Sequence, residues 1–103
     1  MTLTCLHNRL FYFIKIVLFG FSLTACAVSA PVQEMSNARQ SIGAAEAVGA
    51  GNLAASLLSE AQQRLRSATR ELDAGEYERA RLLALESIQL ALKARQIAVS
   101  KSK

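Results

Sequence analysis

The chain has 103 residues, of which 51% are hydrophobic and 19% charged, with a formal net charge of +4 at pH 7. Arg9 and Lys15 both precede Cys26, and beyond that cysteine the chain has ten basic and eight acidic residues. This small excess of positive charge excludes the clustered basic face of a nucleic-acid-binding protein, and the length allows one domain at most.

The segment 1–25 is typical of a secretory signal peptide. Both basic residues of this segment lie within 1–15, where there is no acid, and a short apolar run follows at 16–23. The run is too short to span a hydrocarbon core about 30 Å thick, which takes about 20 residues. The layout therefore predicts a leader that is cleaved.

The next residues, Leu23-Thr24-Ala25-Cys26, resemble a lipobox, the site at which bacterial lipoproteins are lipidated and cut. The resemblance implies that the signal peptidase recognises the first three residues. It implies that the thiol of Cys26 accepts diacylglycerol and that cleavage frees the Cys26 amine for acylation. Each buried CH₂ adds about 0.8 kcal/mol of membrane affinity, so two or three acyl chains give stable anchoring.

Two alternatives compete with lipidation. The segment Val28-Ser29-Ala30 could serve as an ordinary cleavage site, but Pro31 would then follow the cut, where proline is poorly tolerated. The leader could also remain as an uncleaved anchor, and the short apolar run together with Lys15 argues against this.

The residues beyond 25 offer little catalytic chemistry. They contain one cysteine, Cys26, and no histidine, which excludes an intrachain disulfide, a Cys/His zinc site and nucleophilic catalysis by a Ser–His or Cys–His pair. We therefore expect no enzyme, no metal and no cofactor. The acids at 71, 73, 76 and 78 fit a solvated turn between helices. The arginines at 64, 66 and 70 fit a charged helix face that is exposed to solvent. Tyr77 fits an aromatic residue of the core or of the turn.

Three periodic segments follow a short tether. The first predicted helix covers about 32–48, begins after Pro31 and ends at the glycines of 49–51. The second covers about 53–74, with Asn52 as its N-cap and Gly75 as its stop. Glu60 and Arg64 form an i, i+4 pair on this helix. Its apolar seam alternates four and three residues: Ala54, Leu58, Ala61, Leu65, Ala68 and Leu72.

The third predicted helix covers about 76–100 and has a wide apolar arc. A stripe of small residues is flanked on one side by Leu83, Leu90 and Ile97, and on the other by Leu85, Ile88 and Leu92. The stripe consists of Ala80, Ala84, Ala91 and Ala98. A helix with so wide an apolar arc is expected to pack against two neighbouring helices. If it packs against only one, the other apolar flank is left for a partner chain.

The predicted fold is therefore all-α: a small antiparallel three-helix bundle, or a helical hairpin plus a shorter N-terminal helix. The expected organisation is a signal peptide at 1–25, a lipidated cysteine and tether at 26–31, and a helical domain at 32–103.

Over 27–98 the chain resembles a family of small alanine-rich bacterial lipoprotein domains of unknown function, some of which precede an OmpA-like domain. The matching segments are PVQEMSNARQ at 31–40, the central seam helix and AGEYERA at 74–80. The resemblance implies an envelope location and a helical fold, without an activity. The segment at 75–80 also resembles one tetratricopeptide helix hairpin, from which Ser87 departs because alanine is usual there.

The expected function is that of a membrane-anchored envelope lipoprotein acting as a helical interaction or structural module. Ala27 beside the cysteine is compatible with sorting to the periplasmic face of the outer membrane. Expected partners are the membrane, through lipid on Cys26, and a protein or second copy bound through a helix face. The alternatives are a covalent peptidoglycan tether through Lys103 and a small ligand-binding lipoprotein.

Overall fold

The computed structural model describes residues 2–20 and 29–103, and gives side chains for 6–18 and 29–103. Five helices occur in these ranges, and no strand occurs in them. The all-α prediction is confirmed. The helical body, beginning at Val32, is separated in the chain from the first helix by the undescribed residues.

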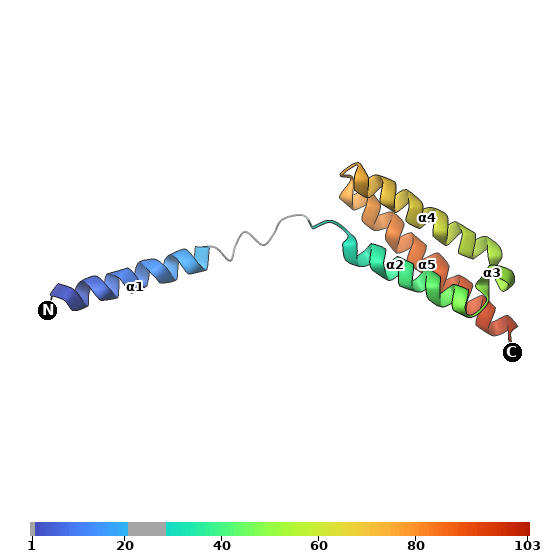
Figure 1. The fold of residues 1–103 in the computed structure, drawn as a ribbon, viewed down its shortest axis with the longest axis horizontal. Coiled ribbons are helices and arrows are strands. Elements are labelled where there is room, and N and C mark those ends of the chain that lie inside the picture. The colour runs from blue at the N-terminus through green and yellow to red at the C-terminus, as the bar shows by residue number, and fades with distance from the viewer. Residues whose placement is uncertain (1, 21–28) are drawn as a thin grey trace.

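Helix α1 (Thr2–Gly20) stands apart from the body, as Figure 1 shows. Its side chains from 6 to 18 are exposed, and it contacts none of the other helices. The rings of His7 and Phe11 lie 5.5 Å apart, a local pair one turn apart on the helix. Within the described ranges, no helix combines the length and the hydropathy that crossing a bilayer requires.

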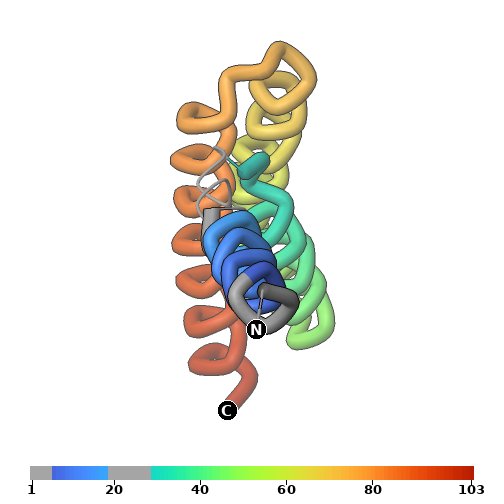
Figure 2. Tube along the Cα trace, turned by 90° about the vertical axis from the view of Figure 1, so that its left-hand side faces the viewer, coloured from blue at the N-terminus to red at the C-terminus, as the bar shows by residue number. Residues whose placement is uncertain are grey.

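The body is a bundle of three long helices: α2 (Val32–Ala47), α4 (Ala55–Asp73) and α5 (Tyr77–Lys101). Helix α4 runs antiparallel to the other two, so α2 and α5 begin at the same end of the bundle (Figure 1). Helix α5 packs on both α2 and α4, and its packing with α4 is the most extensive. Figure 2 shows α5, in orange and red, alongside the other two helices.

Small residues form the contact between α4 and α5. Ala61 and Ala68 of α4 are fully buried, as is the predicted stripe of α5, which the structure extends by Ser87 and Ala94. The Ser87 hydroxyl donates a hydrogen bond to the Ala61 carbonyl oxygen at 2.7 Å. A serine therefore fits the seam because it is small and its polar atom has a partner in the facing helix.

The predicted seam of α4 is confirmed, since all six of its residues are buried or half-buried. The core divides into two clusters, one around Ile42, Leu58 and the alanines of α5, and one around Met35. Leu65 packs against both clusters and so joins the two halves of the core.

The wide arc of α5 divides as the sequence suggests. Leu83, Leu90 and Ile97 pack against the core. Of the other predicted flank, Leu85 and Leu92 are 44% and 46% exposed, whereas Ile88 is half-buried. Both outcomes considered for this helix occur together, because α5 touches two neighbours and still keeps an apolar flank in solvent.

Gly75 ends α4 as predicted. Its φ of +80° lies in the left-handed region that glycine adopts without steric cost. The Glu76 amide donates to the Glu71 carbonyl at 2.9 Å, and the Gly75 amide donates to the Leu72 carbonyl at 3.0 Å. These two bonds form a Schellman motif, which satisfies the last carbonyls of α4 and turns the chain into α5.

The start predicted for the second helix is wrong. Asn52 is not an N-cap but lies inside a one-turn helix, α3 (Ala50–Leu53), and α4 begins after a break at Ala54. Ala54 has φ −145° and makes no side-chain cap. The physical reason is tertiary packing: Ala50 and Ala54 are both buried in the core, and the chain bends between them to bring both there.

Two glycine substitutions should act in opposite directions. Gly75→Ala should lower the free energy of unfolding by about 1–2 kcal/mol, because an L-residue is strained at positive φ. Gly43 lies inside α2, and a Cβ added there meets no atom within 4 Å. Gly43→Ala should therefore raise stability by about 0.5–1 kcal/mol through helix propensity.

Urea denaturation followed by circular dichroism measures both changes. A Gly75→Ala chain as stable as the parent would show that the left-handed turn is not needed to join α4 to α5.

Candidate functional site

The predicted site residues Leu23, Thr24, Ala25 and Cys26 lie outside the described residues. The structure resumes at Ser29, three positions beyond the cysteine. What can be described is therefore the junction between the proposed anchor and the helical body.

The chain is fixed to the body from this point onward. Pro31 is one of the largest fully buried residues of the body. The amide of Val32 donates to the Ala30 carbonyl at 2.8 Å, and the amide of Met35 donates to the Pro31 carbonyl at 3.1 Å. Because proline needs no partner for a backbone N–H, it can be buried at a helix start at little cost.

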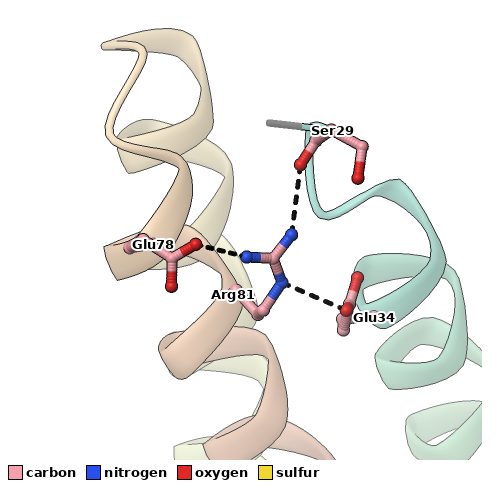
Figure 3. A network of polar contacts seen from close by, with 4 residues as sticks. All are labelled: Ser29, Glu34, Glu78 and Arg81. Atoms are coloured by element: carbon pink, nitrogen blue, oxygen red, sulfur yellow. Dashed lines mark hydrogen bonds and ion pairs between the residues drawn. The ribbon is translucent and has the colours of Figure 1, made fainter. Parts of the chain in front are cut away.

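Arg81 of α5 fastens this junction to the bundle, and Figure 3 shows its contacts. Its Nη2 donates to the Ser29 carbonyl at 3.1 Å, and its Nε donates to a Glu34 carboxylate oxygen at 3.2 Å. Its Nη1 donates to Glu78, one turn earlier on α5. One guanidinium group therefore ties the tether, the first turn of α2 and the first turn of α5 together.

The geometry explains why the position is an arginine. A planar guanidinium presents five donors in a rigid fork, whereas a lysine presents a single ammonium centre. The Arg81 side chain is only 25% exposed, and that of Glu34 is 28% exposed, so their pair is less screened by water than a pair on the open surface.

Arg81 was not among the residues predicted from the sequence. Its spacing of three residues from Glu78 is the one local signal that could have pointed to an ion pair on this helix. Ser29 and Glu34 lie 52 and 47 residues from Arg81 in the chain, and no sequence signal placed them beside it.

A second feature is an apolar stripe on the outer face of α5, which we call the α5 outer stripe. Its positions are spaced by three and four residues along the helix and all are exposed. They are Leu82, Leu85, Gln89, Leu92, Gln96 and Val99. The four apolar members are 60%, 44%, 46% and 37% exposed, in that order.

A third feature is an open groove between α2 and α4, with a volume of about 510 Å³. Ile42, Gly43 and Leu65 contribute to its lining, and Arg39 and Arg66 lie at the same groove. A hydrogen bond joins the two helices beside this groove: the Gln62 side chain of α4 donates to a Glu46 carboxylate oxygen of α2 at 3.0 Å.

Some of the charged groups singled out from the sequence form ion pairs within the bundle. Glu71 lies 4.0 Å from Arg79 across the turn. Arg64 lies 3.8 Å from Glu60, which confirms the predicted i, i+4 pair, and 3.3 Å from Glu86 of α5. Tyr77 is the first residue of α5 and is 36% exposed, so it is a turn aromatic and not a core residue.

The described side chains contain no group of three or more His, Cys, Asp or Glu residues placed to hold a metal ion. In the same part of the chain, every buried polar side-chain atom has a hydrogen-bond partner.

Arg81→Ala should lower the free energy of unfolding by about 1–2 kcal/mol, because it removes three charge-assisted hydrogen bonds, one to the partly buried Glu34 and two to exposed residues. It should also make the peptide around Ser29 more susceptible to protease. Denaturant titration and limited proteolysis measure the two effects.

Arg79→Ala is the matched control. The Arg79 side chain is 72% exposed and its ion pair is long, so its loss should change stability by no more than about 0.5 kcal/mol. Equal effects from the two substitutions would contradict a special role for Arg81.

Comparison with known protein families places this body in a described group. The model of a family described as Domain of unknown function (DUF4398) matches residues 33–103, which is the helical body from the first turn of α2 to the end of the chain. Searches of curated proteins and of solved structures found no match.

Proposed function

This chain belongs to the DUF4398 family, and we propose that it is a lipoprotein of the bacterial cell envelope whose helical domain is an interaction module. Lipid on Cys26 holds the domain at a membrane, at the periplasmic face of the outer membrane. The domain binds a partner through an exposed helix face. It is not an enzyme, since the residues beyond 25 supply neither a histidine nor a second cysteine for nucleophilic catalysis.

The single observation that carries the proposal is the order of features in the leader. A basic segment with Arg9 and Lys15 comes first, an apolar run follows, and a Leu-Thr-Ala-Cys box ends the series at Cys26. Each feature has its own role: the charges orient the leader, the apolar run enters the membrane, and the small Ala25 admits the peptidase beside the cysteine that carries the lipid.

The helical body supports the second half of the proposal. The α5 outer stripe places four large apolar side chains in solvent on one helix face, with Gln89 and Gln96 between them, and exposed apolar surface gathered on one face is typical of an interaction site. Arg81 holds the chain to the body at Ser29, three positions beyond Cys26 in the sequence, so the domain would lie close to the lipid.

The groove between α2 and α4 is the observation that favours the ligand-binding alternative. Arg39 and Arg66 are two exposed cations beside an apolar floor, an arrangement suited to an amphipathic anion. The groove is open to solvent and also contains the Glu46 carboxylate, which would repel an anion, whereas most small-molecule sites bury the greater part of their ligand.

Lipidation should be visible by mass spectrometry of the membrane fraction. We expect a processed chain that starts at Cys26 and carries the mass of acyl chains. Cys26→Ala should leave the unprocessed precursor, because the thiol that accepts diacylglycerol is gone.

Cys5→Ala is the matched control. It removes the other cysteine of the chain, which precedes the apolar run, and should leave processing unchanged. A soluble chain starting at Pro31 would contradict the proposal and indicate ordinary secretion.

The peptidoglycan alternative is separated by a different measurement. Lys103 is exposed at the C-terminus, which lies at the end of the body opposite the start of α2 (Figure 1). Purified sacculi digested with lysozyme should yield no muropeptide joined to Lys103. A lysine-linked muropeptide would replace the non-covalent interaction module with a covalent tether.

A further inference from the structure

We propose that the α5 outer stripe binds the same stripe of a second copy of this chain, with the two α5 helices antiparallel. The inference rests on the proposed function, in which an exposed helix face of the domain binds a partner, and it names that partner.

The spacing of the stripe is that of a two-stranded coiled-coil seam. From Leu82 to Val99 the intervals are three, four, three, four and three residues, so all six positions stay on one face of the helix. They face away from the small stripe of α5, which is buried against α2 and α4. Helix α5 thus has an inner seam that is filled within the bundle and an outer seam without a partner in the described chain.

The exposed large apolar side chains of the body concentrate on this outer seam. In residues 29–103, the only others are Val32 and Tyr77, at the starts of α2 and α5. The outer faces of α2 and α4 carry polar and charged residues instead. Because the exposed apolar surface lies on one helix, it is suited to pairing with one helix face of a partner. A second copy of the chain supplies such a face in its own α5 outer stripe.

Charge complementarity selects the antiparallel arrangement. When Gln89 lies opposite Leu92 of the second copy, Leu82 lies opposite Val99 of that copy and all six positions are paired. In this register Glu86, which also lies 3.3 Å from Arg64 of its own chain, lies beside Lys93 of the second copy, and the two-fold axis repeats the pair. Glu78, at the start of the seam, lies at the level of Lys103 of the second copy.

Other arrangements bring like charges together. Shifting the antiparallel register by one heptad sets Glu86 against Glu86, or Lys93 against Lys93. A parallel pair sets Glu78 against Glu78. In the parallel pair, Arg81 is the basic residue nearest Glu86 of the second copy. The Arg81 guanidinium already donates to three groups of its own chain, so it adds little to a parallel pairing.

The seam is short, since its end positions, 82 and 99, lie about 26 Å apart along a helix that rises about 1.5 Å per residue. An interface of this size is small for a stable dimer in dilute solution. Confinement of both copies to one membrane raises their local concentration, so the pairing is best tested where the chain is anchored.

Disulfide cross-linking in membranes tests the pairing and its direction. The full chain carries Leu82→Cys together with Val99→Cys, the membranes are oxidised, and the products are resolved without reductant. We expect a species of twice the chain mass from the double variant, with the disulfide mapped between positions 82 and 99. Each single variant should give none, because like positions then lie about 26 Å apart, far beyond the reach of a disulfide.

Ser56→Cys with Asp73→Cys is the matched control. Both positions are exposed on α4, and their separation along the helix equals that of positions 82 and 99, so this pair reports random collisions. No cross-linking above this control would overturn the proposal. Cross-linking of the single variants would overturn the antiparallel arrangement, and a product heavier or lighter than two chains would indicate a different partner.

The unsubstituted chain, oxidised in parallel, separates a failure of this inference from a failure of the proposed function. A processed lipoprotein has lost Cys5 and carries lipid on the sulfur of Cys26, so it offers no free thiol. A cross-link through Cys26 would therefore contradict lipidation, while the mapped link between 82 and 99 would still report the dimer.

Charge on the stripe provides a second test. Leu85→Glu with Leu92→Glu, added to the cysteine pair, should reduce cross-linking to the control level. Val32→Glu, an equally drastic change at a side chain 64% exposed on α2, should leave it unchanged. If circular dichroism shows that the double glutamate variant has lost its helices, Lys93→Glu replaces it, and undiminished cross-linking in that variant would overturn the register.

Discussion

The close packing of α4 against α5 through small residues constrains the rest of the bundle. Where Ala61 and Ala68 face Ala84, Ser87 and Ala91, there is no room for a leucine between the helices. The largest fully buried side chains of the body are accordingly Met35, Pro31 and Ser87. The large apolar side chains of α5 lie beside this seam, as do Leu83, Leu90 and Ile97, or on the outer face of the helix, in the α5 outer stripe.

This thin core places more of the stability on local features. Three local features each contribute to the free energy of folding: helix propensity, the Schellman turn at Gly75 and the polar contacts between helices. Their contributions would matter less beside a larger core. Lys101 donates to the Leu53 carbonyl at 3.0 Å, and Gln62 donates to Glu46, so long side chains tie the helices together at the end of α5 and in the middle of the bundle. Arg81 has the same role at the end where the chain enters the domain.

Periodicity was enough to predict the helices and their inner faces. The seam of α4 and the alanines of α5 recur at spacings of three and four, and this pattern is typical of a helix face that packs against a neighbouring helix. Ser87 escaped the pattern because its buried position depends on a hydrogen bond to Ala61, which is contributed by another helix.

The remaining differences between prediction and structure arise from contacts between residues that are distant in the sequence. Asn52 has the chemistry of an N-cap, yet the burial of Ala50 and Ala54 decides where α4 begins. Arg81 is one of several arginines in its segment, and only the fold shows that Ser29 and Glu34 lie beside it. Of the predicted lipidation site, no residue lies within the described structure, so that part of the interpretation still depends on sequence alone.

The contacts of Arg81 also determine how the domain would carry mechanical load. A pull on the chain before Ser29 reaches the bundle at the corner where α2 and α5 both begin. The pull would be shared by the first turns of α2 and α5, which Arg81 joins, and would not fall on α2 alone. Helix α5 has its most extensive packing with α4, so the load would enter the bundle at its best-packed pair of helices.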